Sequence, residues 1–305
     1  MKQINYNEYF EQKVQALTDY VKKYNLEALI LGVSGGIDST VCAAICYEVS
    51  KRIPVKVIGR SLPTHFNQTD EKTAADLVGT AFCYDYKVVC IEDLYQNTVD
   101  YINIIEDDCQ TKLANGNIQA RLRMIYLYNL ASIHKGIVID TDNLTEHNLG
   151  YFTIHGDQGD VNPIGDLWKT QVFELADVLL ERYSVNSHYF ETYSMTENPK
   201  SDYARCKAIA QSLKLKPTAG LGITNNDLEE IGAESYEQVD SVLQEILAWK
   251  RLATGRGDLP EGLKEQKEMF LDEQQMLTIP IEIIINVTNK HFASEFKRKQ
   301  MPIRI

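Results

Sequence analysis

Apolar residues near the start of the chain recur at the spacing of one helix face. They occupy positions 10, 14, 17 and 21, which lie on the same side of a helix. A short continuous apolar run then extends from Ala28 to Val33 and leads into glycines. The run is too short for an ordinary buried helix, so it predicts a strand that is buried on both faces, as in a parallel sheet.

Strand and helix signals alternate over the next hundred residues. Short apolar runs predict strands at 55–59, 87–91 and 136–139, and longer segments predict helices at 39–49, 71–78, 92–105 and 120–134. This alternation indicates βαβ units. The predicted fold class is therefore α/β, with a doubly wound parallel sheet flanked by helices.

The pattern changes after Asp140. Residues 141–168 carry Gly, Asn, Asp and Pro and predict a loop, and residues 186–201 are polar and irregular, as in a flap. Helices are predicted at 167–183, 202–213, 227–231, 236–253 and 280–296. We expect these later helices to pack on the same sheet, so that residues 1–305 form a single domain. The polar stretch 255–274 predicts a surface insertion.

Composition narrows the class of protein. Hydrophobic residues make up 44% and charged residues 24% of the chain, close to a soluble globular average. The net charge of −12 argues against a broad nucleic-acid-binding face, which needs clustered Lys and Arg. No run of about 18 apolar residues predicts a membrane span. The cysteines form no Cys-x-x-Cys pair, and Cys42 and Cys46 are interpreted as buried small hydrophobes, with a zinc site or disulfides as the alternative. A cytoplasmic protein is expected.

The turn after the first predicted strand has the features of a phosphate site. Gly35 and Gly36 allow the backbone to bend where a Cβ would clash. The helix that follows offers free N–H groups and the positive end of its dipole. Ser34 and Ser39 add hydroxyl donors. Together these groups favour an anion such as a phosphate.

Asp38 is the unexpected residue of this turn, because a carboxylate beside phosphates would repel them. It could hold Mg²⁺, which binds one or two carboxylates together with phosphate oxygens, or it could cap the helix. The string lacks the Gly-Lys-Ser/Thr ending of the P-loop and the Gly-x-Gly-x-x-Gly of dinucleotide folds. It resembles the pyrophosphate loop of enzymes that cut ATP between the α and β phosphates.

Further motifs, in order, resemble ammonia-dependent NAD synthetase from about Val33 to Tyr236. They are Gly116-Asn117-Ile118-Gln119-Ala120-Arg121-Leu122-Arg123-Met124, Thr141-Asp142-Asn143-Leu144-Thr145-Glu146, Gly150-Tyr151-Phe152-Thr153, Gly156-Asp157-Gln158-Gly159-Asp160-Val161-Asn162-Pro163, Leu167-Trp168-Lys169-Thr170 and Lys216-Pro217-Thr218-Ala219-Gly220-Leu221. The resemblance implies that deamido-NAD is adenylated by ATP with release of pyrophosphate. Ammonia, free or supplied by a separate chain, would then displace AMP. It also implies a homodimer.

The resemblance also implies residue roles. The catalytic residues would be Asp38 and Lys169, and the Mg²⁺ ligands Asp38 and Glu146. The residues that contact ATP would be Gly32, Ser34, Gly35, Gly36, Asp38, Ser39, Arg60, Gln68, Thr141, Lys169 and Thr218. Those that contact deamido-NAD would be Arg121, Asp160 and Lys297. Purely structural roles also remain open for three of these residues. Lys169 could be a solvated surface residue, Glu146 a carboxylate that stabilises the first turn of a helix, and Arg121 a surface or ion-paired arginine.

Departures from the family's pattern fall on the side of the acceptor. Ile154 stands where the family has a Lys, Leu228 where it has the Glu of an Asp-Glu pair, and Phe296 where it has a His. His155 could replace the missing cation, or be an ordinary loop histidine. The adenylating chemistry is therefore expected, while a related ligase for another carboxylate, a GMP synthetase-like core and a weak adenine-nucleotide-binding module remain alternatives.

Overall fold

A computed structural model describes residues 4–106, 112–185, 200–215, 227–254, 279–298 and 303–304. Its centre is a parallel sheet of six strands in the order β3-β2-β1-β4-β5-β6. The strands are β1 (Ala28–Gly32), β2 (Lys56–Ser61), β3 (Asp85–Val88), β4 (Gly136–Ile139), β5 (Val161–Asn162) and β6 (Ile303–Arg304). The predicted α/β fold with a doubly wound parallel sheet is confirmed.

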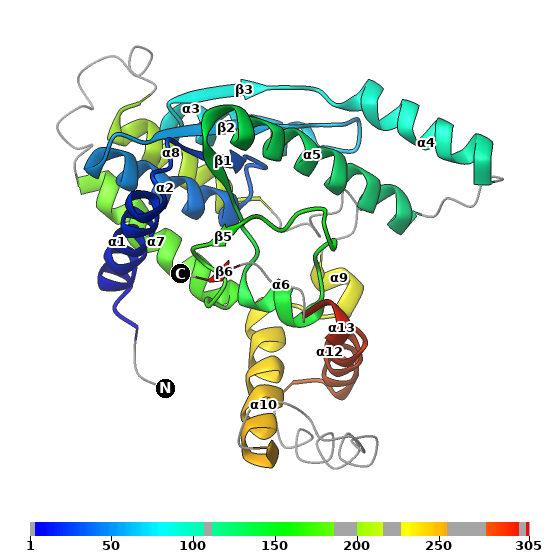
Figure 1. Cartoon of the computed structure of the whole chain (residues 1–305). Helices are drawn as coiled ribbons and strands as arrows, with labels where there is room; N and C mark the ends of the chain where they lie inside the picture. Colours follow the sequence, from blue (N-terminus) through cyan, green and yellow to red (C-terminus); the bar gives the residue numbers. More distant parts are fainter. Residues whose placement is uncertain are drawn as a thin grey trace.

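β1 is the central strand, as its continuous apolar sequence predicts. It pairs with β2 on one side and with β4 on the other. Leu29, Ile30 and Leu31 are completely buried, because helices cover both faces of the sheet (Figure 1). The carboxyl ends of β1, β2 and β4 therefore meet at one edge of the sheet, where ligands bind in open α/β folds.

Two layers of helices enclose the sheet. The helices of the described chain are α1 (Tyr6–Tyr24), α2 (Ile37–Arg52), α3 (Thr69–Phe82), α4 (Glu92–Glu106), α5 (Lys112–His134), α6 (Leu144–Leu149), α7 (Lys169–Val185), α8 (Asp202–Ser212), α9 (Asp227–Ile231), α10 (Tyr236–Thr254), α12 (Ile281–Ala293) and α13 (Glu295–Arg298). Leu29 and Leu31 pack in one core with α1, α2, α3, α7 and α8. Ile30 packs in a second core with α4 and α5. Alternate side chains of β1 thus define the two faces.

The structure corrects some predicted boundaries. β3 covers Asp85–Val88 instead of 87–91. Ile91 is buried, but its backbone N–H donates to Pro63 and its carbonyl accepts from Tyr95 at the start of α4. Its apolar side chain therefore reflects packing beneath a helix rather than a strand. α5 begins at Lys112, earlier than expected, and the predicted loop 141–168 contains α6 and β5.

A third apolar cluster joins the C-terminal helices to α6. It contains residues of α9, α10 and α12 together with Leu149 of α6. α10 contacts both α6 and α7, and the group lies to one side of the sheet in Figure 1. The predicted flap at 186–201 falls largely outside the described residues, as does the predicted insertion at 255–274. None of the described helices is long and apolar enough to cross a membrane.

Candidate functional site

The turn between β1 and α2 is held in place by its own hydroxyl groups. The Oγ of Ser39 donates to the carbonyl of Gly36 at 3.0 Å and lies 3.0 Å from the Oγ of Ser34. The Oγ of Ser34 also accepts the N–H of Gly36 at 3.2 Å. α2 begins directly after Gly36. The first N–H groups of the helix therefore stand at the mouth of the turn, as an anion site requires.

Gly35 is required by two independent constraints. Its φ of +86° lies in the left-handed region that side chains disfavour. A Cβ at this position would stand 2.5 Å from the backbone N of Ala75 and 2.7 Å from the carbonyl O of Glu71. Because both contacts are with the backbone of α3, no side chain can move to relieve them. The turn is thus packed directly against α3.

Three charged side chains from three helices meet beside this turn. The Nζ of Lys169, at the start of α7, donates to Oδ2 of Asp38 on α2 and, at 3.2 Å, to Oε1 of Glu146 on α6. Lys169 is 3% exposed. Burial opposes its charge, but the two carboxylates outweigh burial and raise the pKa of Lys169 well above its ordinary value. The ammonium therefore stays charged at neutral pH.

Glu146 serves the local helix and the site at once. Its Oε2 accepts the N–H of Asn143 at 3.1 Å, and the side chain of Asn143 accepts the N–H of Glu146, which forms a capping box at the start of α6. Its Oε1 binds Lys169. The Nδ2 of Asn143 also donates to Oδ1 of Asp38 at 2.9 Å. The two readings of Glu146, a helix first-turn carboxylate and a member of the site, are therefore compatible.

Asp240 on α10, which the sequence analysis did not identify, binds residues next to Glu146 and Lys169. Its Oδ1 accepts the hydroxyl of Thr145, and its Oδ2 accepts the N–H of Thr170 at 3.0 Å. The hydroxyl of Thr145 in turn accepts the N–H of Lys169 at 2.8 Å. Asp240 is 1% exposed. One buried carboxylate thus joins α10 to the helix starts that carry Glu146 and Lys169.

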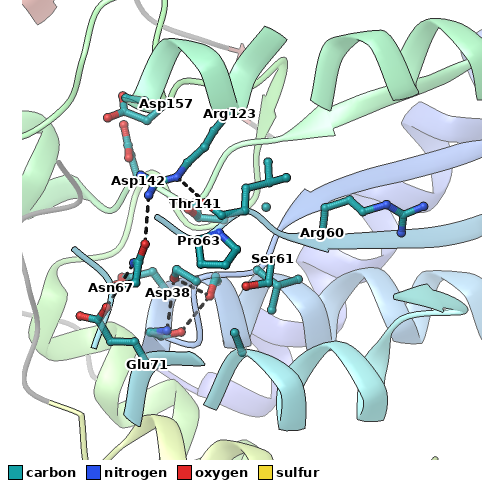
Figure 2. A pocket seen from close by; sticks show the side chains of 18 of the residues that line it. Asp38, Arg60, Ser61, Pro63, Asn67, Glu71, Arg123, Thr141, Asp142 and Asp157 are labelled. Atoms are coloured by element: carbon teal, nitrogen blue, oxygen red, sulfur yellow. Dashed lines mark hydrogen bonds between the residues drawn. The ribbon is translucent and has the colours of Figure 1, made fainter. Parts of the chain in front are cut away.

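These groups line a pocket of about 290 Å³ at the carboxyl edge of the sheet. Predicted residues that line it are Gly32, Ser34, Gly36, Asp38, Ser39, Arg60, Gln68, Thr141, Glu146 and Lys169. Figure 2 shows the pocket with Asp38 and Thr141 on its wall. Residues from distant parts of the sequence are therefore brought together as the predicted ATP site requires, and further lining residues include Asn67, Arg123, Asp142 and Asp157.

Arg60 has a different environment from the one expected for a ligand-binding cation. Its guanidinium donates to Oδ2 of Asp85 at 2.8 Å and to the carbonyl groups of Gly59 and Asp85. In Figure 2 it points away from Asp38 and Thr141. Its side chain is 3% exposed. The guanidinium therefore links β2 to β3, and Arg60 lines the pocket at the end of its strand.

The residues predicted to contact deamido-NAD lie outside the lining of this pocket. Arg121 is exposed and its Nη2 stands 3.4 Å from the carbonyl O of Ile154. The carboxylate of Asp160 accepts the N–H of Val138 at 2.9 Å and the hydroxyl of Tyr128 at 3.1 Å. Both side chains thus make contacts within the protein, and their role toward a ligand stays a prediction.

Lys297 on α13 holds the turn that follows α6. Its Nζ donates to the carbonyl O of Gly150 at 2.9 Å and of Phe152 at 2.7 Å. Leu228 packs against the C-terminal apolar cluster, which explains an apolar residue at that position. Thr218 lies outside the described residues.

Two carboxyl groups that the prediction did not include lie next to each other on the same side of the pocket as Arg123, as Figure 2 shows. Asp142 and Asp157 are partly exposed to the pocket, yet dense protein surrounds them. Burial raises the pKa of Asp157 to about 7, against the opposing hydrogen bond from Thr153 and the charge of Lys297. Burial, and then the carboxylate of Asp140, raise the pKa of Asp142 well above its ordinary value.

We expect Asp157→Asn to stabilise the protein more at pH 8 than at pH 5. A carboxyl whose pKa is raised in the folded state favours folding at low pH and loses this contribution as the pH rises toward 7. The amide stays neutral, so the advantage of the variant should grow by roughly 1–3 kcal/mol over this interval. Urea unfolding at both pH values measures it. An equal advantage at both pH values, or a similar change in the exposed control Asp177→Asn, would contradict the assignment.

We expect Lys297→Met to destabilise the protein by about 1–3 kcal/mol, because two largely buried carbonyl groups lose their donor. Urea unfolding at pH 7 measures the free energy of unfolding. Glu282→Gln, an exposed change on α12, is the control and should change it by less than about 0.5 kcal/mol. An unchanged midpoint in Lys297→Met would show that these carbonyl groups are satisfied without Lys297.

Comparison with known proteins gives a consistent result. Residues 9–301 match the NAD synthase family. A relative from Thermoplasma acidophilum, described as an NH(3)-dependent NAD(+) synthetase, is 31% identical over 240 residues, which cover 78% of this chain and 85% of the relative. A relative of the same description from Pyrococcus furiosus is 29% identical and covers 96% of this chain and 94% of its own.

A solved structure shares the fold over nearly the whole chain. The NMN synthetase from Francisella tularensis is 25% identical, with a TM-score of 0.68 and coverage of 97% of both chains. The resemblance that the motifs predicted is therefore confirmed. Because the family match extends over residues 9–301 and includes every segment that builds the pocket, the chain belongs to the NAD synthase family.

Proposed function

We propose that the protein is a C–N ligase that amidates deamido-NAD to NAD with ammonia at the expense of ATP. The carboxylate of the acceptor would attack the α-phosphate of ATP, which gives an adenylate and pyrophosphate, and ammonia would then displace AMP. The observation that carries the proposal is the meeting of Lys169, Asp38 and Glu146 beside the Ser34–Ser39 turn in one pocket. Membership of the NAD synthase family supports it.

The chemistry asks mainly for positioning and for stabilisation of negative charge on phosphate oxygens. The start of α2 and the hydroxyl groups of Ser34 and Ser39 can bind these oxygens. Lys169 supplies a fixed positive charge within the same pocket. A carboxylate is a poor electrophile, and adenylation gives it a leaving group that ammonia can displace.

We propose Asp38 and Glu146 as the residues that hold Mg²⁺. Their oxygens approach the same point, because Nζ of Lys169 contacts one oxygen of each. Two carboxylates leave room for phosphate oxygens and water, which Mg²⁺ prefers to a site made wholly of protein. The part of the chain that the structure describes contains no group of three or more His, Cys, Asp or Glu able to hold a metal, so the proposal rests on these two carboxylates and the ligand's own oxygens. When bound, the ion would neutralise phosphate charge.

The nitrogen donor and the location of the enzyme are part of the proposal. Free ammonia, or ammonia from a separate chain, is supported by relatives that are described as NH(3)-dependent. A cytoplasmic location is supported by the free state of the cysteines that the structure describes. Cys42, Cys46, Cys83, Cys90 and Cys206 are all free, as expected in a reducing compartment.

A second acceptor is favoured by a specific observation. The Francisella structure that matches the chain over 97% of its length is described as an NMN synthetase. The departures at Ile154, Leu228 and Phe296 fall on the acceptor side of the family's pattern. The nicotinate mononucleotide, which contains the same carboxylate without the adenylate half, is therefore the alternative substrate.

Incubation with ATP, Mg²⁺ and ammonium tests the proposal. Parallel reactions contain deamido-NAD, nicotinate mononucleotide or no acceptor, and AMP, pyrophosphate and the amide product are measured. We expect AMP and amide in equal amounts with deamido-NAD and little AMP without an acceptor. A higher kcat/KM for nicotinate mononucleotide than for deamido-NAD would identify the mononucleotide as the acceptor. If no acceptor gives pyrophosphate, the protein is a nucleotide-binding module and the proposed ligase activity is refuted.

Asp38→Asn should lower kcat by roughly 10²–10³-fold, because it removes a charge that both orients Lys169 and is proposed to hold Mg²⁺. Pyrophosphate release at saturating ATP measures the effect. Asp177→Asn, an exposed change on α7, is the control and should retain the parental rate. A normal rate in Asp38→Asn over a range of Mg²⁺ concentrations would refute its role.

We propose that the protein forms a homodimer through α4 and α5. α5 buries Leu122 and Leu127 against the sheet, yet its outer face carries Ile125 at 65% and Ile133 at 64% exposure. Tyr101 on α4 is 66% exposed. Exposed large apolar side chains of this kind are candidates for a protein–protein contact.

The double variant Ile125→Glu, Ile133→Glu should be monomeric, because each interface would bring like charges and unpaired carboxylates into an apolar contact. Analytical ultracentrifugation at micromolar concentration measures the mass. Ile281→Glu, a change at an exposed apolar residue of α12, should leave the dimer intact. A monomer in the parental protein, or a dimer in the double variant, would contradict the proposed surface.

A further inference from the structure

The cationic side chains of the pocket differ in how their charge is balanced. The described lining contains Arg60, Lys72, Arg123 and Lys169. Arg60 is ion-paired with Asp85, and Lys169 with Asp38 and Glu146. Lys72 is exposed to solvent. Within the described residues, Arg123 is the partly buried pocket cation that has no carboxylate oxygen within ion-pair distance.

Arg123 is bound by neutral acceptors alone. Its Nε donates to the carbonyl O of Leu62 at 3.0 Å, and its Nη2 lies 3.3 Å from Oδ1 of Asn67 and 3.5 Å from Oε1 of Gln119. Its Nη1 makes no hydrogen bond within the described part of the chain. The guanidinium is therefore oriented by the protein, while one of its nitrogen atoms remains available toward the pocket.

The charge of Arg123 is poorly compensated by the protein. Burial lowers its pKa, and the carboxyl groups of Asp157 and Glu71 oppose this effect only from a distance. Asp157 is itself a weak counterion, because burial raises its pKa to about 7. A desolvated guanidinium that lacks a counterion is costly. A ligand oxyanion in the pocket would supply the missing partner with one or two charge-assisted hydrogen bonds.

Arg123 and Lys169 approach the pocket from opposite faces of the sheet. α5, which carries Arg123, packs in the core with α4, whereas α7 and the phosphate-binding turn belong to the other face. Figure 2 shows Arg123 beside Asn67, on the side of the pocket lined by Thr141, Asp142 and Asp157. Lys169 is held by Asp38 and Glu146 on its own side of the pocket. Arg123 therefore supplies positive charge to a different part of the pocket.

We propose that Arg123 is a substrate-binding residue that holds a phosphate or carboxylate oxygen of the reacting molecules. The inference rests on the proposed adenylating function, because only then do ATP and an anionic acceptor share the pocket. The oxyanion belongs either to ATP or to the acceptor. Arg60 is ion-paired with Asp85, and neither Arg121 nor Lys297 lines the pocket. Arg123 is therefore the pocket cation best placed to recognise it.

Isothermal titration with ATP, deamido-NAD and nicotinate mononucleotide, each alone, tests the proposal without turnover. We expect Arg123→Met to bind one of these molecules roughly 10- to 100-fold more weakly. Arg123→Lys, which keeps the charge, should recover most of the affinity. Weaker binding of ATP alone assigns a phosphate of ATP, and weaker binding of an acceptor alone assigns an acceptor oxyanion.

Asn67→Ala separates ligand binding from support of the loop after β2. This variant removes a contact of Arg123 but keeps the guanidinium. If Arg123 only supports the loop, Asn67→Ala will reproduce the loss. Rescue of Arg123→Ala by added guanidinium is a second measurement, because a small cation can restore the charge but not the link to Leu62. Unchanged affinities in Arg123→Met, or equal losses in Asn67→Ala with no rescue, would overturn the proposal.

Ligand binding and amidation, measured separately, distinguish a wrong role for Arg123 from a wrong function for the protein. If the parental protein binds ATP but amidates neither acceptor, the function fails while the titrations still report on Arg123. If amidation is intact in Arg123→Met with parental KM values, the function stands and the role of Arg123 is excluded.

Discussion

The ammonium of Lys169 between the carboxylates of Asp38 and Glu146 is the contact on which the site depends. The three residues come from α7, α2 and α6, so the contact forms only when three separate helix starts reach the same edge of the sheet. Buried charges are costly unless they are paired and hydrogen-bonded. The pairing therefore makes it possible to keep all three charges in a pocket that must also accept phosphates.

Each partner in this contact is also fixed by its local structure. Glu146 belongs to a capping box with Asn143, and Asn143 reaches across to Asp38. Asp240 links the backbone of α7 and the hydroxyl of Thr145. Rigid placement of this kind allows charged groups to stabilise a developing charge without first reorganising. The glycine turn is held in the same way, because Gly35 packs against the backbone of α3.

Local signals in the sequence were sufficient for the central fold and for the phosphate-binding turn. The run from Ala28 to Val33 is apolar because helices cover both faces of β1, and the glycines that follow are needed by the backbone of the turn. The family's motifs correctly indicated that distant residues such as Glu146 and Lys169 line one pocket with Asp38. Edge strands were harder to predict, since β3 is partly exposed and the apolar Ile91 packs beneath α4 instead.

Side-chain partners could not be predicted from the same signals. An arginine at the end of β2 can equally bind a ligand or Asp85, and only the paired strand β3 decides between them. Lys297 contacts carbonyl groups that are distant in the sequence. Asp240 interrupts an apolar helix face without any motif around it. Asp240 and the protein partners of Arg60 and Lys297 were missed because these contacts depend on the tertiary structure rather than on spacing in the sequence.

The hydrogen bonds of Asp240 also affect how the protein unfolds. Proteins open in cooperative parts whose stabilities differ, and parts with small apolar cores open more readily. The cluster of α9, α10 and α12 is separate from the two cores that enclose the sheet. Because the carboxylate of Asp240 on α10 binds Thr145 and Thr170, partial opening of that cluster would remove this support from the helix starts that carry Glu146 and Lys169 while the sheet remained folded. Heat inactivation would then precede global unfolding.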